Sequence, residues 1–336
     1  MIVRARAPLR VDLAGGWTDV AAYAGRRGGA VVNVALTLHA HVLVRRGGSG
    51  VRLRALDLGA VVSATRLEDL RADGELALVK AAARLHAPEG PMEIVTRSDA
   101  PPGSGLGGSG ALGVALVAAL GTMRGVRRLP AEIAGLAFEA EVREAGIVGG
   151  KQDQYAAALG GLQFLAFGDP GIAATRLDVP SDAMRELEQT LVLCYTGASR
   201  VSGDTHRRVW QAFGRGERAT VAALDGLRES AFAMRSALER GALGDVARVL
   251  DENWACQQAL AEGMRTPRME ALETVGRDAG ADGVKACGAG AGGCLAFLAR
   301  PGREEEVAEA LRVAGGVVLR AGFDLSGVAS WEAAER

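Results

Sequence analysis

A glycine-rich segment near residue 100 carries groups suited to holding a chain of phosphates. It reads Pro-Pro-Gly-Ser-Gly-Leu-Gly-Gly-Ser-Gly over residues 101–110 and runs directly into an apolar stretch. Glycines let backbone N–H groups approach a ligand closely, and a helix start adds unpaired donors and the positive end of the helix dipole. Ser109 could offer its hydroxyl to a metal ion on those phosphates. A flexible connector is the alternative, but connectors seldom lead straight into a long apolar helix.

This segment matches neither of two common nucleotide-binding loops. No Lys-Ser or Lys-Thr pair follows the glycines, as a Walker loop requires. No acidic residue follows ~20 positions later within a βαβ pattern, as a dinucleotide fingerprint requires. A second glycine cluster occupies residues 285–293, before a short apolar run. Alone it indicates only a tight turn, but with the first cluster it suggests two loops that close on one substrate.

Two further segments carry charged side chains that could act on a substrate. Glu141 lies on a predicted helix that ends at Gly149-Gly150, and Lys151 and Asp153 follow that turn. A carboxylate placed there could take or orient a hydroxyl proton during phosphoryl transfer. The other segment spans residues 7–19, where a strand delivers Arg10 and a turn then presents Trp17, Thr18 and Asp19. It is interpreted either as a hairpin with surface polar groups or as a polyol-binding loop.

Arg200 follows a predicted buried strand at residues 191–195 and is well suited to a distal sugar phosphate. The alternative is a surface arginine in an arginine-rich chain, since only three of the 39 basic residues are lysines. The four histidines fall outside these segments, and none is assigned a catalytic role. They are His39, His41, His86 and His206.

The elements that must position these groups are a mixture of strands and helices. Strands are expected around residues 10–14, 42–44, 92–96, 191–195, 294–297 and 317–319, and helices over 76–85, 110–123, 130–144, much of 204–281, and 303–313. They do not alternate as regular βαβ units, so the pattern indicates the α+β class. The length of 336 residues suggests about two domains.

Composition excludes several classes of protein. With 49% hydrophobic residues the chain can bury a sizeable core, and a net charge of −1 gives no long-range attraction to nucleic acid or an anionic membrane. Neither a signal peptide nor a membrane span is expected, so the predicted location is the cytoplasm. The four cysteines imply neither a disulfide framework nor a metal site. A homodimer is compatible with the sequence, which does not define the oligomeric state.

Taken together and in order, the segments at residues 7–19, 98–110, 149–157 and 285–293 resemble the GHMP kinases, named for galactokinase, homoserine kinase, mevalonate kinase and phosphomevalonate kinase. Within that superfamily they most resemble the D-glycero-D-manno-heptose 7-phosphate kinases, with the bacterial fucokinase domains as near relatives. The resemblance implies a two-domain α+β fold. Residues 1–187 would form a ribosomal protein S5 domain 2-like domain, and residues 188–336 a ferredoxin-like domain.

The resemblance also implies a role for each matching residue. Asp153 corresponds to the catalytic aspartate, Arg10 to an arginine that stabilises the transferred phosphoryl group, and Lys151 to a lysine expected in the heptose kinases. Ser109 and Glu141 correspond to the Mg²⁺ ligands. The expected ATP-binding residues are Pro102, Gly103, Ser104, Gly105, Leu106, Gly107, Gly108, Ser109, Gly288 and Gly290. The expected substrate-binding residues are Trp17, Thr18, Asp19, Gly150, Gln152 and Arg200.

The implied activity is ATP- and Mg²⁺-dependent phosphorylation of an anomeric hydroxyl, with D-glycero-D-manno-heptose 7-phosphate as acceptor and the 1,7-bisphosphate as product. Trp17 stands where heptose kinases more often have glycine, which favours the alternative of a fucokinase or galactokinase-type enzyme acting on a free hexose. A third hypothesis is an inactive sensor of a nucleotide or sugar. Its mark would be loss of the catalytic or metal-binding residues, and Asp153, Glu141 and Ser109 are all present.

Overall fold

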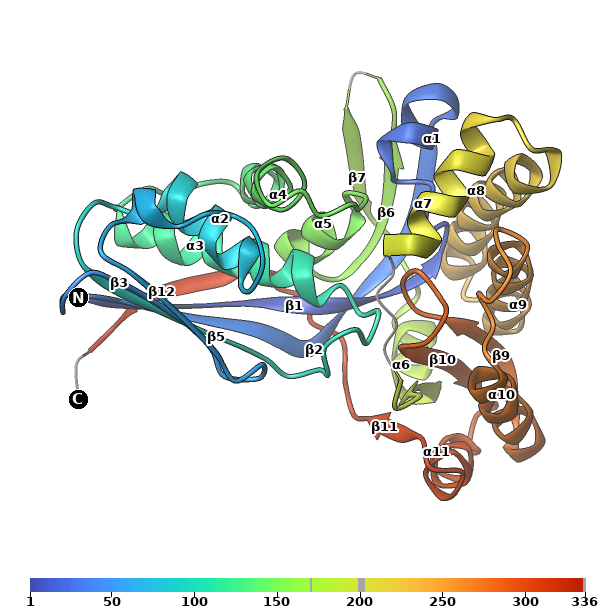
Figure 1. Ribbon diagram of the computed structural model, residues 1–336. Helices are drawn as coiled ribbons and strands as arrows, with labels where there is room; N and C mark the ends of the chain where they lie inside the picture. The colour runs from blue at the N-terminus through green and yellow to red at the C-terminus, as the bar shows by residue number, and fades with distance from the viewer. Residues whose placement is uncertain (170, 199–202, 335–336) are drawn as a thin grey trace.

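The computed structural model describes residues 1–169, 171–198 and 203–334. Figure 1 shows two sheets with helices packed against them. The strands of the larger sheet are β1 (Ile2–Ala14), β2 (Gly29–Arg46), β3 (Val51–Ala55), β4 (Ala60–Ala64), β5 (Met92–Ser98), β6 (Leu162–Phe167), β7 (Ile172–Arg176) and β12 (Ala329–Ala333). The smaller sheet contains β8 (Leu191–Tyr195), β9 (Ala281–Ala286), β10 (Cys294–Ala299) and β11 (Val317–Leu319).

The helices and short turns lie between these strands. They are α1 (Ala21–Arg27), η1 (Leu67–Asp69), α2 (Ala77–His86), α3 (Gly108–Met123), α4 (Pro130–Phe138), η2 (Glu139–Glu144), α5 (Gln152–Leu159), α6 (Ser181–Thr190), α7 (Gly203–Gly214), α8 (Arg218–Glu239), α9 (Leu243–Gln258), α10 (Pro267–Ala279) and α11 (Glu304–Val313). These bounds confirm the predicted α+β class. The predicted helix over residues 130–144 is corrected in its last part, because η2 is a π-helical turn.

The larger sheet is organised around the long strand β2. The sheet order is β12-β1-β2-β5-β3-β4, and β2 pairs with β5 along its second half and with β6 along its first half. In Figure 1, α2, α3, α4 and α5 lie on one side of this sheet. The smaller sheet has the order β11-β8-β10-β9 and is antiparallel throughout.

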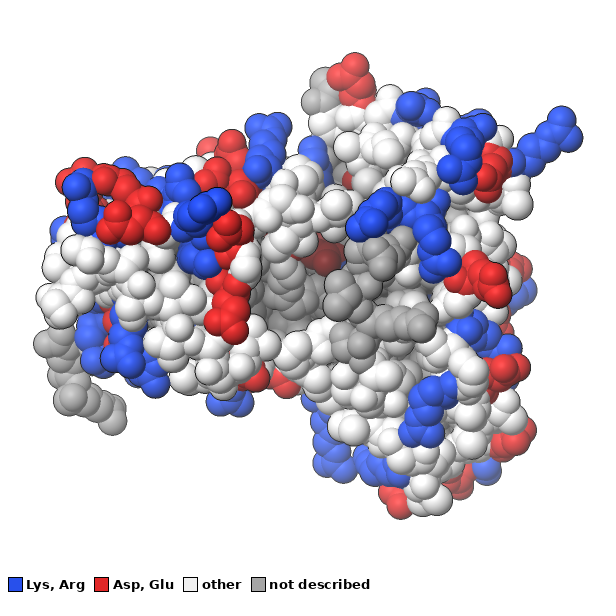
Figure 2. All heavy atoms as spheres, in the orientation of Figure 1, with Lys and Arg blue, Asp and Glu red and all other residues white. Residues whose placement is uncertain are grey.

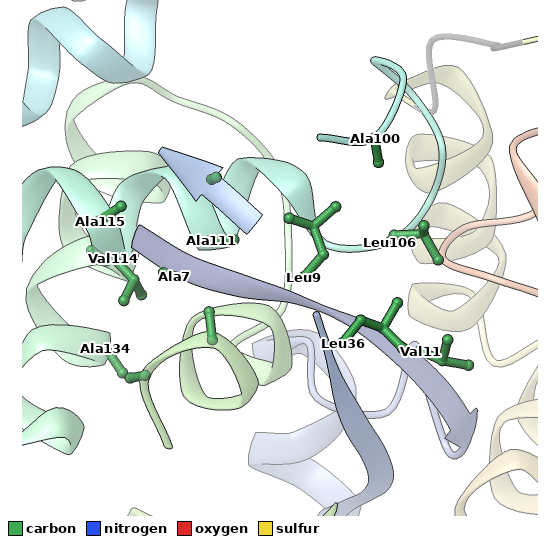
Figure 3. Close-up of a cluster of buried hydrophobic side chains, with 14 of the residues drawn as sticks. Ala7, Leu9, Val11, Leu36, Ala100, Leu106, Ala111, Val114, Ala115 and Ala134 are labelled. Carbon is green, nitrogen blue, oxygen red and sulfur yellow. The ribbon is translucent and has the colours of Figure 1, made fainter. Parts of the chain in front are cut away.

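The main core lies between α3 and the larger sheet. Helix α3 is apolar on all sides and almost entirely buried, as expected for a central helix. Figure 3 shows Leu9 and Val11 of β1 beside Leu36 of β2, with small alanine side chains projecting from α3 and α4. Because alanines are short, the helices approach the strands closely, and this packing fixes the loop that leads into α3.

The end of the chain does not follow the expected domain division. Strand β12 pairs antiparallel with β1, from Ile2 opposite Ala333 to Arg6 opposite Ala329. The prediction that all of residues 188–336 belong to the second domain is therefore wrong for this strand. The backbone groups at the outer edge of β1 form the hydrogen bonds that position β12. A strand of only five residues does not indicate from its sequence which strand it pairs with.

Candidate active site

A cavity of about 580 Å³ lies where the loops before α3, α5 and β10 converge. Figure 2 shows the corresponding hollow between the two lobes of the molecule. Most of the predicted site residues line it, although they come from distant parts of the chain. They are Arg10, Trp17, Asp19, Pro102, Gly103, Ser104, Gly105, Gly107, Gly108, Ser109, Glu141, Gly150, Gln152, Asp153, Gly288 and Gly290.

The two glycine-rich loops lie in backbone contact with each other. A Cβ on Gly105 would come within 2.5 Å of the Cys287 carbonyl oxygen, so a side chain there would force the loops apart. The Cys294 N–H also donates to the Ser104 carbonyl at 2.8 Å. Gly107, with a φ of 74°, precedes the first turn of α3. The first N–H groups of this helix have no partner within the helix itself and are available to an anion.

Arg10 and Asp153 form an ion pair between these loops and the rest of the cavity. The Arg10 Nε and Nη2 atoms lie 2.8 and 2.6 Å from the Asp153 Oδ1 atom, and Nη1 donates to the Gly105 carbonyl at 2.6 Å. Asp153 lies in the first turn of α5 and its side chain is 28% exposed, while that of Arg10 is 4% exposed. The arginine is thus fixed by packing, and the carboxylate it holds remains accessible to a substrate.

Glu141 is a buried carboxylate with neutral partners. Its oxygens accept hydrogen bonds from the Ser109 hydroxyl and, at 2.6 Å, from the Gln154 amide. Burial raises the pKa of Glu141 to about 7, and this effect outweighs the hydrogen bonds from Ser109 and Gln154, which lower the pKa. The nearby charge of Asp153 adds a smaller rise. The π-helical turn η2 carries this residue, and such turns often occur at functional sites. A hydroxyl beside a carboxylate without a compensating cation is a donor set that suits Mg²⁺.

Asp19 and Trp17 form the opposite part of the cavity. Asp19 accepts a hydrogen bond from the Gln152 backbone N–H at 3.0 Å, and burial raises the pKa of Asp19 to about 6. A Cβ on Gly150 would overlap the Asp19 carboxylate, so only glycine fits there. Trp17 has a φ of 79°, an unusual conformation for a bulky residue, and its ring stacks on that of His206 of α7 at 4.3 Å between centroids.

Three predicted site residues are placed differently from the expectation, and a fourth lies outside the described residues. Thr18 is fully buried and its hydroxyl bonds the Gly15 and Ala30 carbonyls, so it holds the turn together and is not available to a substrate. Leu106 is fully buried in the core, where it anchors the loop. The Lys151 ammonium lies 5.2 Å from the centre of the Phe138 ring, and Lys151 is not among the residues that line the cavity. Arg200 lies outside the described residues.

The structure adds two residues that sequence reasoning missed. His206 lines the cavity although it is 53 positions beyond Asp153, and burial lowers its pKa. Gln154 belongs to the segment at residues 149–157, but no role is predicted for it from the sequence. In the structure its amide donates a hydrogen bond to the Glu141 carboxylate. Neither position has a signal in its local sequence, because the contact partners come from separate elements. Only the tertiary fold brings them together.

Comparisons with known proteins identify the family of this chain. The model for the GHMP kinases N terminal domain matches residues 76–161, and the model for the GHMP kinases C terminal domain matches residues 234–316. The D-glycero-alpha-D-manno-heptose 7-phosphate kinase of Campylobacter jejuni is 32% identical, over 98% of both chains. The chain therefore belongs to the GHMP kinase family and is a phosphoryl-transferring enzyme.

Two other relatives place the chain more narrowly within the family. The crystal structure of a D-glycero-D-manno-heptose 1-phosphate kinase from Bacteroides thetaiotaomicron is 29% identical, with a TM-score of 0.81 over 99% of this chain and 100% of that one. The L-fucokinase/L-fucose-1-P guanylyltransferase of Bacteroides fragilis is 28% identical over 89% of this chain but only 35% of that protein. The predicted fold and kinase family are thus confirmed. No helix among the described residues is both long and apolar enough to cross a membrane.

Proposed function

We propose that the chain transfers the γ-phosphoryl group of ATP to the anomeric hydroxyl of D-glycero-D-manno-heptose 7-phosphate, giving the 1,7-bisphosphate. The observation that carries this proposal is the Arg10–Asp153 pair. It lies between two glycine loops suited to phosphates and a wall, formed by Asp19 and Trp17, suited to a sugar. The full-length similarity to heptose kinases supports the choice of acceptor.

The nucleotide would occupy the side of the cavity next to α2 and α3. This side is lined by apolar residues, among them Leu58, Leu76, Val79 and Leu112, which suit the faces of a purine ring. The glycine loop and the first N–H groups of α3 would hold the phosphates. The contact between the loops at Gly105 and Gly288 supports a role for the second glycine cluster in holding the same phosphates.

Ser109 and Glu141 would hold Mg²⁺, with the phosphates completing its oxygen shell. A divalent cation would supply the positive charge that the Glu141 carboxylate lacks in the described structure. When bound, it would neutralise charge on the phosphates that rises during transfer.

Asp153 would act as the base and Arg10 would stabilise the transferred group. The acceptor oxygen attacks the γ-phosphorus, the bond from that phosphorus to the β–γ bridging oxygen breaks, and the acceptor proton passes to Asp153. The accessible carboxylate meets the geometric requirement for a base. Arg10 directs two of its nitrogens to Asp153, so its positive charge lies beside the reacting hydroxyl. Asp19 would accept a hydrogen bond from another sugar hydroxyl.

Basic side chains of α7 would contact the phosphate at position 7 of the substrate. Figure 2 shows Lys and Arg side chains gathered over α7 beside the hollow, and this helix carries the exposed residues Arg207 and Arg208. His206 of the same helix lines the cavity, so α7 is near enough to reach a distal group of the acceptor. Arg200 remains a further candidate for this role.

Replacement of the base tests the proposal directly. The Asp153→Ala variant should lose ATP-dependent phosphorylation by roughly 10²–10⁴-fold, because the acceptor hydroxyl loses its proton acceptor. Nucleotide binding should be retained, since the phosphate loop does not depend on this carboxylate. The measurement is ADP release in parallel with ATP binding by calorimetry. Near-wild-type turnover in the variant would contradict the assignment of Asp153.

A panel of acceptors separates the proposed substrate from the alternative, a hexose 1-kinase. The Trp17 side chain in the acceptor wall is the observation that favours that alternative. ADP release should be fastest with D-glycero-D-manno-heptose 7-phosphate and much slower with fucose, galactose and mannose. The unphosphorylated heptose is the control for the phosphate contact, and it should show a raised KM. A preference for a free hexose would establish the alternative and leave the kinase chemistry intact.

A further inference from the structure

A cluster of side chains of the types that bind metals lies outside the lining of the candidate active site. The structure places one possible ligand atom from each of His39, His41 and Asp99 within 4.8 Å of one another, the one such cluster found among the described residues. None of the three lines the cavity described above, although Ala40 between the two histidines does. Because side chains alternate along a strand, His39 and His41 project together from the opposite side of β2.

Backbone pairing determines how Asp99 meets these histidines. β2 and β5 are antiparallel with Ala40 opposite Ser98, so the next residue, Asp99, lies level with His39. The Asp99 N–H donates to the His39 carbonyl at 3.0 Å, and the Asp99 Oδ2 atom accepts from the His39 N–H at 3.1 Å. The same Oδ2 atom lies 2.9 Å from the His41 Nε2 atom. The arrangement therefore rests on strand geometry.

A fourth residue, Asp324, orients the buried member of the cluster. Its Oδ2 atom lies 2.8 Å from the His39 Nε2 atom, and its Oδ1 atom accepts from the backbone N–H groups of Ser326 and Gly327. A carboxylate requires a hydrogen on the ring nitrogen that it contacts, so neutral His39 carries its proton on Nε2. The Nδ1 atom then keeps its lone pair. A carboxylate that fixes a histidine in this way is the usual outer partner of a metal-ligating histidine.

We propose that His39, His41 and Asp99 bind a divalent transition metal, with zinc as the best match, and that Asp324 is the outer partner of His39. Two imidazoles and one carboxylate are a ligand set typical of zinc, whereas Mg²⁺ prefers oxygen ligands alone. On binding, the metal takes the place of the proton between His41 Nε2 and Asp99 Oδ2, and His41 carries its proton on Nδ1. The Arg97 guanidinium lies 3.5 Å from the Asp99 Oδ1 atom, so Oδ2 is the ligand atom.

The exposure of the cluster allows the ion to enter from solvent. The side chains of His41 and Asp99 are 43% and 25% exposed, whereas those of His39 and Asp324 are 9% and 8% exposed. Tetrahedral zinc with bonds of ~2.0–2.2 Å would bring its donors roughly 3.3–3.5 Å apart. Through Asp324, the ion would join β2 and β5 to the segment that returns to β12, which makes its role structural.

Zinc binding by the full chain tests the proposal. After treatment with a chelator, the protein is loaded with zinc chloride in excess Mg²⁺, passed through a desalting column and analysed for metal content. The wild type should retain about one zinc ion per chain and unfold at a higher temperature with zinc than without. His41→Ala and Asp99→Asn should each retain at least tenfold less zinc. The control His206→Ala removes a histidine outside the cluster and should retain zinc as the wild type does.

Cobalt provides a readout that does not depend on any variant. Co²⁺ bound to the wild-type protein should give the intense visible absorption of a tetrahedral site, and zinc should displace it. Loss of zinc from both cluster variants together with this spectrum would establish the site. Retention of only a small fraction of a zinc ion by the wild type, or unchanged retention in both variants, would overturn the proposal.

Discussion

At the scale of single residues, the candidate active site combines two buried carboxyl groups with one ion-paired arginine. Glu141 and Asp19 are both buried, and burial raises the pKa of each, to about 7 and about 6. Arg10 is already engaged by Asp153 and by the Gly105 carbonyl. Burial therefore favours the protonated forms of Glu141 and Asp19, and a cation that binds Glu141 must compete with its proton.

Binding of Mg²⁺ should accordingly depend on pH. Below about pH 7 the ion competes with the proton on Glu141, so its apparent affinity should fall by up to tenfold per pH unit. Activity lost at pH 6 should be restored by more Mg²⁺, as measured by ADP release across a Mg²⁺ titration at each pH. A Mg²⁺ requirement that stays constant between pH 6 and pH 8 would contradict the assignment of Glu141 as a ligand.

The same shift has a consequence for stability in the absence of metal. The folded state binds the Glu141 proton more tightly than the unfolded state does, so this group lowers the free energy of unfolding progressively as the pH rises from about 4.5 to about 7. At pH 8 the Glu141→Gln variant should therefore be more stable than the wild type by roughly 2 kcal/mol, as measured by urea unfolding. Addition of Mg²⁺ should stabilise only the wild type.

Sequence reasoning found most of these residues through motif resemblance, but it did not find their electrostatic state. The pKa of Glu141 depends on the π-helical turn that directs it inward, and neighbouring residues carry no signal for that turn. The catalytic role of Lys151 stays a prediction. Its place near Asp153 in the sequence suggests a shared site, whereas in the structure its ammonium contacts the Phe138 ring.

At the scale of elements, the carboxylate of Asp153, the proposed base, is positioned by the close approach of α3 and α5. Gly110, in the first turn of α3, lies against Asp153, and a Cβ on Gly110 would come within 2.5 Å of the Asp153 Cβ atom. The apolar run predicted α3 almost to its bounds. It could not predict that one of its glycines is required for contact with another helix, because the partner lies 43 residues away.

Gly110→Ala should reduce kcat through displacement of Asp153. Alanine in a helix interior is otherwise more favourable than glycine by roughly 0.5–1 kcal/mol, so any loss would reflect the contact and not the helix. We expect kcat to fall by about 10²-fold, a loss typical of a small displacement in a catalytic site. Gly135→Ala is the matched control, because this α4 position has open space around it. Equal turnover in the two variants would contradict this account of the α3–α5 contact.

At the scale of the whole molecule, a buried ion pair links the two sheets. Lys285 of β9 is fully buried and its Nζ atom lies 3.0 Å from the Asp12 Oδ2 atom and 2.5 Å from the Asp12 carbonyl oxygen. The sequence had suggested Lys285 as part of an active-site motif. Its ammonium instead joins β9 to β1, and the two glycine loops lie just beyond these strands.

Lys285→Met should destabilise the protein by about 3–5 kcal/mol, because it leaves the Asp12 carboxylate buried without a partner. Adding Asp12→Asn should recover part of this loss. The control is Arg300→Met, which removes an exposed ion pair between Arg300 and Asp282, a residue of the same strand β9. This variant should lower the free energy of unfolding by less than about 1 kcal/mol. Urea unfolding of all three variants provides the measurement. Equal losses for the buried and the exposed pair would contradict this role of Lys285.

The antiparallel pairing of β12 with β1 also constrains the chain when it is partly unfolded. This ladder joins segments near opposite ends of the sequence, so everything between them becomes one closed loop. The entropy lost in closing a loop grows only with the logarithm of its length, so a short strand can hold even this long one. The pairing of β12 with β1 thus holds the two ends of the chain together reversibly. While β12 stays paired with β1, the smaller sheet can unfold, and the chain segments on both sides of it remain attached to the larger sheet.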